Sequence, residues 1–322
     1  MAPVISLVIP VYNSADVLPE LHRRIRAAME SIESCYECIL VDDSSTDQSW
    51  RAIKALAQAD ERVRGFRMAR NFWQHNAVLA GIRVARGGKI VTLDDDLQNP
   101  PEEIGKLLQA LEQDLDVVYG TPERQWHGFL RNGASRIIKY ALAVVMGAET
   151  ARHVSSYRAF HTRLRDAFVH YHGPAVNIDV LLTWGTTRFG AVTVQHEERK
   201  SGRSGYSFWK LVGHAFNMIT GYTTLPLQIG SIIGLVCASV GVIILAYVLV
   251  GYVLHGSQVA GFTFVASLLA IFFGTNMFLL GIFGEYLARM HLGSIGRPPY
   301  LIASSTGADQ TNETKTCNRE ET

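Results

Sequence analysis

Hydrophobic residues in the first 123 positions alternate between short continuous runs and longer stretches in which they recur at helical spacing. Short runs typical of strands occupy residues 5–11, 38–41, 63–68, 90–93 and 116–119. Between them, the pattern of helices occupies residues 15–32, 48–59, 76–85 and 101–111. Strands that alternate with helices in this way predict an α/β domain built on a mostly parallel, doubly wound sheet.

A second pattern begins after Lys210, because no Asp, Glu, Lys or Arg occurs between that residue and Glu285. Two apolar segments in this region, 225–254 and 262–287, are each longer than the roughly 20 residues that cross a hydrocarbon core. A short polar stretch separates them. We predict two transmembrane helices within residues 225–288; the alternative is a pair of buried helices in a soluble protein.

Basic residues flank the two apolar segments on their outer sides, whereas the connection between the segments has none. They are Arg199, Lys200, Arg203 and Lys210 before the first segment and Arg289 and Arg297 after the second. Positive charge marks the cytoplasmic side, so we expect residues 1–224 to form a cytoplasmic domain. Residues 289–322 are expected to form a cytoplasmic tail that is disordered at its polar end. The N-terminus lacks the basic start of a signal peptide, which agrees with this topology.

The middle of the chain, residues 126–224, is expected to link the first domain to the bilayer. Residues 129–146 combine an apolar run with Arg131, Arg136 and Lys139, as a helix in the membrane interface near anionic lipid does. We therefore predict interfacial helices here, with ordinary amphipathic packing on the sheet as the alternative.

Charge and cysteine content exclude two classes of function. The formal net charge is +1 and the basic residues are scattered, which gives no electrostatic reason to expect nucleic-acid binding. Cys35 and Cys38 have the spacing of zinc ligands, but no second pair of Cys or His completes a tetrahedral site. We interpret both as structural residues in a reducing compartment.

Polar motifs follow each of the five expected strands. They are Pro10 to Asn13, Asp42 to Asp47, Arg70-Asn71, Asp94 to Asp96, and Gly120 to Arg124. In doubly wound sheets, ligands bind beyond the carboxyl ends of the strands. The five motifs are therefore expected to converge on one cleft.

The acidic run Asp94-Asp95-Asp96 is the most informative of these motifs. Side chains on a strand alternate between faces, so Asp94 and Asp96 are expected to point the same way and Asp95 the other way. Two carboxylates with the Gln98 carbonyl nearby would form an oxygen site for Mg²⁺ or Mn²⁺. The alternative is that the acids cap the helix that begins at Pro101.

The cleft chemistry indicates a nucleotide. Asp42 can accept hydrogen bonds from a base or ribose, and Tyr12 can lie against a ring, although Tyr12 could also only pack. Asp43, Ser44 and Asp47 are common turn and N-cap residues, which is their alternative role. Neither G-x-G-x-x-G after the first strand nor G-x-x-x-x-G-K-[ST] is present, which disfavours dinucleotide and P-loop sites.

Together these motifs resemble those of family 2 glycosyltransferases with a GT-A fold, a nucleotide-sugar-binding domain. The motifs that carry the resemblance are Val8-Ile9-Pro10-Val11-Tyr12-Asn13, Val41-Asp42-Asp43-Ser44-Ser45-Thr46-Asp47, Arg70-Asn71 and Asp94 to Pro101. Further along, the chain resembles the polyprenyl-phosphate glycosyltransferases, the group of dolichol-phosphate mannose synthase. The later motifs are His196, Glu198-Arg199, Gly202, Ser204, Tyr206-Ser207 and Gly284-Glu285-Tyr286.

The resemblance implies a role for particular residues. Those that would hold the nucleoside are Pro10, Tyr12, Asn13 and Asp42, with Asp94 at the diphosphate. Asp94, Asp96 and Gln98 would hold the metal, and the acceptor phosphate would face Arg124, Arg158, Arg199 and Ser204. Asp94, Asp96, Arg124 and Arg158 are thus the predicted catalytic residues, with a surface ion pair as the alternative for Arg158. The chain departs from the family pattern at Asn13, often Glu, at Gly205, usually Lys, and at Trp73, customarily Gly.

The activity implied is inverting transfer of a sugar from a nucleotide-sugar, expected to be UDP-linked, to undecaprenyl phosphate. The location implied is the cytoplasmic face of the bacterial inner membrane, in envelope-glycan or lipopolysaccharide modification. The protein is expected to form a homo-oligomer and to work with a flippase for lipid-linked sugars. The alternatives are a processive polysaccharide synthase, disfavoured by only two spans and no Gln-x-x-Arg-Trp, and an inactive membrane scaffold, disfavoured by the intact carboxylates.

Overall fold

The computed structural model describes residues 3–32, 35–122, 143, 146–147, 151, 153–173, 176–197, 219–255 and 262–306. The predicted site residues Arg124, Arg199 and Ser204 lie outside these residues, as does nearly all of the interfacial helix expected at 129–146.

The described residues form one eight-stranded sheet in the order β7-β5-β6-β4-β1-β2-β3-β8. Its strands are β1 (Ile5–Val11), β2 (Tyr36–Asp42), β3 (Val63–Met68), β4 (Lys89–Thr92), β5 (Val117–Pro122), β6 (Arg158–His161), β7 (Phe189–Val194) and β8 (Ile302–Ser305). β1 pairs in parallel with β2 and β4, β2 with β3, and β5 with β7. β6 and β8 are antiparallel to their neighbours. The predicted α/β class with a mostly parallel sheet is confirmed.

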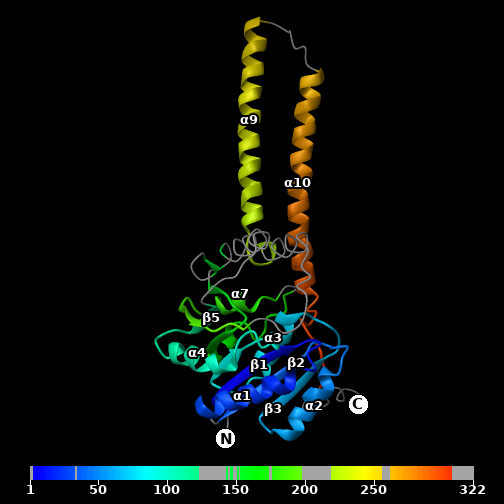
Figure 1. Ribbon diagram of the computed structural model, residues 1–322. Coiled ribbons are helices and arrows are strands. Elements are labelled where there is room, and N and C mark those ends of the chain that lie inside the picture. The colour runs from blue at the N-terminus through cyan, green and yellow to red at the C-terminus, as the bar shows by residue number, and fades with distance from the viewer. Residues whose placement is uncertain are drawn as a thin grey trace, which may run out of the picture.

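Helices cover both faces of this sheet (Figure 1). On one face lie α1 (Leu18–Ile32), α2 (Ser49–Ala59), and η1 (Pro101–Glu103) followed by α4 (Ile104–Leu111). On the other face lie α3 (Gln74–Val84), η2 (Thr162–Ala167) and α7 (Ile178–Leu182). β1 shows why a central strand is apolar throughout: Leu7 and Ile9 pack on the first face and Val8 on the second.

β5 is longer than the sequence pattern predicts. Gly120 and Pro122 were expected in the loop after the strand, and that expectation is wrong, because β7 pairs with β5 in parallel as far as Pro122 and Val194. β6, β7 and β8 were not anticipated. Each contributes a few residues whose partners lie far away in the chain, so no local pattern announces them.

Two long helices extend from the α/β domain as a pair (Figure 1). α9 (Leu225–His255) has 31 residues and α10 (Phe262–Ser294) has 33. Near the domain, Gly230 of α9 allows close approach: a Cβ there would lie 2.7 Å from Leu279 Cδ2 of α10. No helix within the described ranges meets the combined requirement of length and apolarity for a membrane span.

After α10, the chain returns to the α/β domain and adds a strand to it. β8 pairs antiparallel with β3, and Thr306 closes the pairing by donating its N–H to Gly65 O at 2.9 Å. The chain that leaves the C-terminal end of α10 is therefore tied to the same sheet that carries the cleft motifs.

Candidate active site

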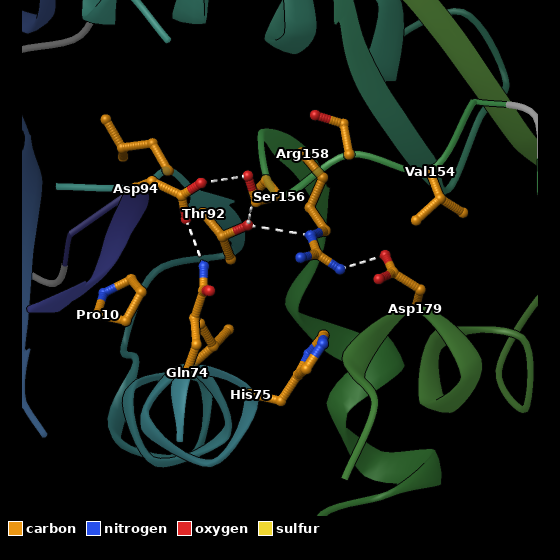
Figure 2. A pocket seen from close by; sticks show the side chains of 12 residues that line it. Pro10, Gln74, His75, Thr92, Asp94, Val154, Ser156, Arg158 and Asp179 are labelled. Atoms are coloured by element: carbon orange, nitrogen blue, oxygen red, sulfur yellow. Dashed lines mark hydrogen bonds and ion pairs between the residues drawn. The ribbon is translucent and has the colours of Figure 1, made fainter. Parts of the chain in front are cut away.

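A cavity of about 200 Å³ opens at the carboxyl ends of β1 and β4 (Figure 2). Pro10 and Asp94 line it from the ends of these two strands, and Gln74 lines it from the start of α3. Ser156 and Arg158 complete the opposite wall from the start of β6. The strand-end motifs after β1 and β4 thus meet at one cavity, as expected for a doubly wound sheet.

Neutral donors hold the carboxylate of Asp94 in this cavity (Figure 2). Gln74 Nε2 donates to Oδ1 at 2.6 Å, and Ser156 Oγ donates to Oδ2 at 2.5 Å. These contacts orient the carboxylate. The role of Gln74 and Ser156 was missed, since only the fold brings Ser156, 62 residues away, to Asp94.

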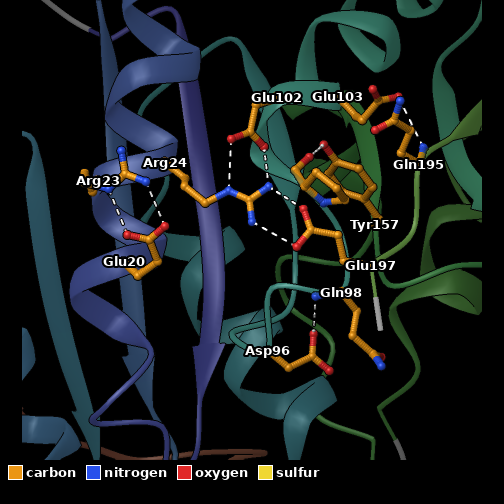
Figure 3. A network of polar contacts seen from close by, with 11 residues as sticks. Glu20, Arg23, Arg24, Asp96, Gln98, Glu102, Glu103, Tyr157, Gln195 and Glu197 are labelled. Carbon is orange, nitrogen blue, oxygen red and sulfur yellow. Dashed lines mark hydrogen bonds and ion pairs between the residues drawn. The ribbon is translucent and has the colours of Figure 1, made fainter. Parts of the chain in front are cut away.

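A turn, not a strand, presents the acidic run. β4 ends at Thr92 and Asp95-Asp96 lie in a turn, so the argument from strand alternation was wrong for Asp94 and Asp96. Asp96 Oδ1 accepts a hydrogen bond from the backbone N–H of Gln98 at 3.1 Å (Figure 3). The alternative role as a helix cap is also wrong, because neither η1 nor α4 has a side-chain N-cap hydrogen bond.

The carboxylates after β4 have the chemistry to bind a divalent cation whose coordination shell is completed by the substrate. In the described part of the chain, no group of three or more His, Cys, Asp or Glu is placed to hold a metal ion. Asp94 and Asp96 supply carboxylate oxygens two residues apart. Mg²⁺ is commonly held by one or two carboxylates together with substrate phosphates and water, and these side chains have that chemistry. Of Asp94, Asp96 and Gln98, Asp94 lines the cavity and the other two do not.

Asp95 has a different task. Its Oδ2 accepts hydrogen bonds from Tyr12 N, at 3.0 Å, and from Ser14 Oγ. Burial raises the pKa of Asp95 to about 6, although these two donors oppose the rise. Asp95 therefore ties the loop after β1 to the loop after β4 and keeps the cavity walls together.

Asp42, predicted to contact the nucleoside, ends β2 and is fully buried. Its Oδ1 accepts a hydrogen bond from Ser45 N at 3.0 Å. Arg67 Nε of β3 lies 3.2 Å from Oδ2 as an ion pair, but its geometry is too poor for a hydrogen bond, and that oxygen has no hydrogen-bond donor. Arg67 thus lies beside the carboxylate, and the nucleoside contact of Asp42 stays a prediction.

Asp43 and Asp47 have local roles. Asp43 Oδ1 accepts the N–H of Phe72 at 2.6 Å, and burial raises the pKa of Asp43 to about 6. Asp47 accepts the N–H groups of Ala15 and Ser49 at the loop after β1 and the start of α2. The turn alternative is thus confirmed for Asp47, whereas Asp43 links the end of β2 to the loop before α3.

Tyr12 and Asn13 follow β1 at the mouth of the cleft. The Tyr12 side chain is 49% exposed, which argues against a packing role alone. Asn13 has φ 54°, and its Oδ1 accepts the Thr46 N–H at 2.8 Å. Asn13 therefore joins two strand-end loops, and the nucleoside contacts of both residues stay predictions.

Arg158 lies in a buried network at the back of the cavity (Figure 2). Its guanidinium forms an ion pair with Asp179 of α7 and donates to Thr92 Oγ1 at 3.1 Å. Tyr119 OH donates to the same Asp179 oxygen at 3.0 Å. With Arg158 only 3% exposed, the alternative of a surface ion pair is wrong. Its contact with an acceptor phosphate stays a prediction.

A second network fixes the segment that follows the acidic run (Figure 3). Arg24 of α1 donates to Glu102 at 2.8 Å and to Glu197, which follows β7, at 2.7 Å. These two hydrogen bonds raise the pKa of Arg24 above its usual value. Tyr157 OH adds a bond to Pro100 O at 3.0 Å. The segment between Asp96 and α4 is thus held by α1 and by residues distant in sequence.

Comparison with known proteins adds a family to this geometry. The family model described as "Glycosyl transferase family 2" matches residues 6–175. The chain is 35% identical over 301 residues to the undecaprenyl-phosphate 4-deoxy-4-formamido-L-arabinose transferase of Sodalis glossinidius (strain morsitans), covering 92% of each. It is 36% identical over 311 residues to the protein of that name from Yersinia enterocolitica, covering 95% of each.

Solved structures agree in fold. Glucosyl-3-phosphoglycerate synthase from Mycobacterium tuberculosis, in complex with Mn²⁺, uridine diphosphate and phosphoglyceric acid, is similar with a TM-score of 0.50 and 14% identity. The similarity covers 68% of this chain and 77% of that chain. At this identity, the likeness supports the GT-A fold alone.

Proposed function

The chain belongs to glycosyl transferase family 2, as its motifs predict, and we propose that it transfers one sugar from a UDP-sugar to undecaprenyl phosphate. The observation that carries the proposal is Asp94, whose carboxylate is held by Gln74 and Ser156 at the carboxyl ends of β1 and β4. The curated relatives, named for transfer to undecaprenyl phosphate, support the choice of acceptor. Inversion at the anomeric carbon is part of the proposal.

Asp94, Asp96 and Gln98 would hold a Mg²⁺ or Mn²⁺ ion together with the donor diphosphate. Bound there, the ion would neutralise charge on the leaving diphosphate. The Mn²⁺ and uridine diphosphate named for the mycobacterial synthase support a divalent ion and a uridine nucleotide. The protein's own part is to place the carboxylates: Gln74 and Ser156 orient Asp94, and Gln98 N–H orients Asp96.

The acceptor needs no general base from the protein. A phosphate monoester has its second pKa near 6, so it is largely ionised at neutral pH and can attack directly. The remaining task is to hold one anion beside another, which arginine performs by bidentate contact. Arg124, Arg158, Arg199 and Ser204 are the groups we assign to it. The Arg158–Asp179 pair shows how an arginine can be kept oriented at the cavity wall.

We further propose that α9 and α10 cross the inner membrane and keep the α/β domain at its cytoplasmic face. Both helices expose large apolar side chains, such as Tyr247 at 79% and Val253 at 80%, which water disfavours. Residues 211–284 contain no Asp, Glu, Lys or Arg, and basic residues flank them. A helix of 31 residues rises about 46 Å, more than the roughly 30 Å of a hydrocarbon core.

The experiment is an incubation of membranes containing the protein with undecaprenyl phosphate and a panel of radiolabelled nucleotide-sugars. We expect one labelled lipid carrying a single sugar, formed only with the acceptor and abolished by EDTA. A ladder of longer products would identify a processive synthase. If no donor supports transfer, the proposal is overturned, and the inactive membrane scaffold is the alternative that remains.

Membrane integration has a separate test. We expect the intact protein to stay in the pellet after a carbonate wash of the membranes. Release into the supernatant would contradict the assignment of α9 and α10 as spans. A homo-oligomeric state and delivery of the product to a flippase remain predictions, to be tested by cross-linking in the same membranes.

A further inference from the structure

Trp73 combines two features that each disfavour its presence. Its side chain is 76% exposed, the highest value for a large hydrophobic residue among the described positions of the α/β domain. Its backbone has φ 74° and ψ 156°, a conformation that glycine adopts readily and that any residue with a Cβ adopts only under constraint. Neither packing nor backbone preference explains an indole at this position.

Hydrogen bonds on both sides hold Trp73 in this conformation. Before it, Phe72 N donates to Asp43 Oδ1 at 2.6 Å. After it, Gln74 Nε2 donates to Asp94 Oδ1 at 2.6 Å. Trp73 N itself donates to Asn71 Oδ1 at 3.1 Å. The Trp73 carbonyl accepts the N–H of Asn76, in the first turn of α3, at 3.0 Å. The surrounding structure therefore over-determines the strained residue.

These anchors place Trp73 at the carboxyl edge of the sheet, directly before Gln74, which lines the cavity. Asp43 follows β2 and Asp94 follows β4, and the sheet order puts β1 between these two strands. Neighbouring strands lie about 4.8 Å apart, so the loop from Phe72 to Gln74 bridges about 10 Å across the carboxyl end of β1. Tyr12, which is also exposed, follows the end of β1. Gln74, the next residue, lines the cavity.

From this placement we propose that the indole of Trp73 stacks on the sugar ring of the nucleotide-sugar and helps to select the sugar. A pyranose presents an apolar face of C–H groups between polar edges, and an indole is a flat apolar surface that matches such a face. The proposal rests on the proposed function, because it assumes a nucleotide-sugar in the cavity beside Asp94. Trp73 would be a specificity-determining residue that contacts the donor.

The test compares two ligands on the full-length protein in detergent, by titration calorimetry. UDP alone probes the nucleotide site, and the UDP-sugar that the wild type uses probes nucleotide and sugar together. For Trp73→Gly, we expect UDP affinity unchanged and UDP-sugar affinity reduced about tenfold. Trp73→Phe should retain most of the affinity. Trp184→Phe, at a tryptophan of the same domain that is 50% exposed, is the matched control and should bind both ligands as the wild type does.

Stability and acceptor kinetics separate the remaining explanations. The melting temperature of Trp73→Gly should equal or exceed that of the wild type, since glycine relieves the backbone conformation. The KM for undecaprenyl phosphate should not change. Transfer from competing UDP-sugars should become less selective.

Three results would overturn the inference. The first is an unchanged affinity of Trp73→Gly for the UDP-sugar. The second is an equal loss of affinity for UDP and for the UDP-sugar, which would place the indole on the nucleotide. The third is a loss confined to vesicle binding or to the acceptor KM, which would place the indole at the membrane. If the wild type transfers sugar and Trp73→Gly behaves identically, only this inference fails. If the wild type binds no nucleotide-sugar, the proposed function fails with it.

Discussion

The two ends of the central strands treat their carboxylates in opposite ways. At the amino ends, arginines hold them: Arg64 contacts Glu37 at 2.7 Å, Arg62 contacts Asp60 at 2.8 Å, and Arg188 contacts Asp116 at 3.0 Å. At the carboxyl ends, neutral donors make the hydrogen bonds. Asp43 accepts from a backbone N–H, Asp95 from a backbone N–H and a serine, and Asp94 from a glutamine and a serine.

The pKa values follow the same division. Burial raises the pKa of Asp43 and of Asp95 to about 6 at the carboxyl ends. At the amino ends, burial would raise the pKa of Asp60, but hydrogen bonds from Arg62 and His22 outweigh it and lower the value to about 2. The hydrogen bond from Arg188 likewise holds the pKa of Asp116 well below its usual range.

The comparison separates structural charge from charge kept for a ligand. A carboxylate neutralised by arginine stabilises the fold and has little left to offer a cation. A carboxylate held only by neutral donors has no arginine to offset burial, which raises the pKa of Asp43 and Asp95, and its oxygens stay available to a cation. Among the described residues, Arg67 and Arg158 depart from this division at the carboxyl ends. Arg67 pairs with Asp42, a predicted site residue. Arg158, itself a predicted site residue, pairs with Asp179.

The largest effect is expected for Arg158→Ala, which leaves the buried carboxylate of Asp179 without its partner. Breaking a buried ion pair in this way costs about 3–5 kcal/mol of stability. The measurement is the melting temperature in detergent, with transfer assayed well below it. Donor affinity should be retained while acceptor-dependent turnover falls.

The double variant Arg158→Ala/Asp179→Asn distinguishes the two roles of Arg158. Removing both charges should recover part of the lost stability. If Arg158 contacts the acceptor phosphate, turnover should stay low despite that recovery. Recovery of turnover together with stability would show that the arginine serves the fold alone.

Asp96→Ala tests the carboxyl-end side of the comparison. Mutation of a residue that hydrogen-bonds a metal ligand typically lowers metal affinity or activity by about 10–100-fold. Loss of a ligand itself should therefore reduce transfer by about 100-fold or more. The melting temperature should change little, because Asp96 is partly exposed in a turn. EDTA should mimic the variant in the wild type, and Mg²⁺ or Mn²⁺ should restore activity. Full activity of Asp96→Ala, or of the wild type in chelator, would contradict a metal site here.

Asp116→Ala is the matched variant at the amino ends and should give the reverse result. It removes hydrogen bonds from Arg163, Arg188 and Thr186. Because both arginines are substantially exposed, we expect a modest loss of about 2 kcal/mol, seen as a lower melting temperature. Transfer per folded molecule should be unchanged at low temperature. A selective loss of transfer would mean that the two ends are not functionally separate.

The smallest effect is expected in the pH dependence of stability. The raised pKa of Asp43 means that the folded state binds its proton more tightly, so this group makes stability fall as pH rises from about 4 to about 6. Asp43→Asn mimics the neutral form and can still accept the N–H of Phe72. The melting temperature of Asp43→Asn should match that of the wild type below pH 4 and exceed it above pH 6. The corresponding gain in the free energy of unfolding should be about 1–2 kcal/mol.

Asp60→Asn supplies the opposite sign. The lowered pKa of Asp60 contributes stability that is present above about pH 4 and is lost as pH falls toward 2. The wild type should therefore be more stable than Asp60→Asn at neutral pH, with the difference shrinking on acidification. Parallel pH profiles for the two variants would remove the contrast between the strand ends.

Local pattern by itself determined the first half of the domain. The apolar runs of β1 to β4 and the helical spacing of α1 to α4 lie in contiguous residues, so the position of each strand end, and with it Asp42 and Asp94, could be predicted. The motifs around these residues were enough to predict the family and the edge of the sheet at which the site lies. The absence of Asp, Glu, Lys and Arg from residues 211–284 was likewise a local feature.

The tertiary structure decided what surrounds those residues. Ser156 reaches Asp94 across 62 positions, and Glu197 reaches Arg24 across 173. β7 lengthens β5, β8 returns from beyond α10, and Asp179 buries Arg158. The strain at Trp73 arises because Asp43 and Asp94 anchor its neighbours from two strands. Contacts of this kind depend on which distant segments the fold brings together, and a periodic pattern in contiguous residues does not encode that choice.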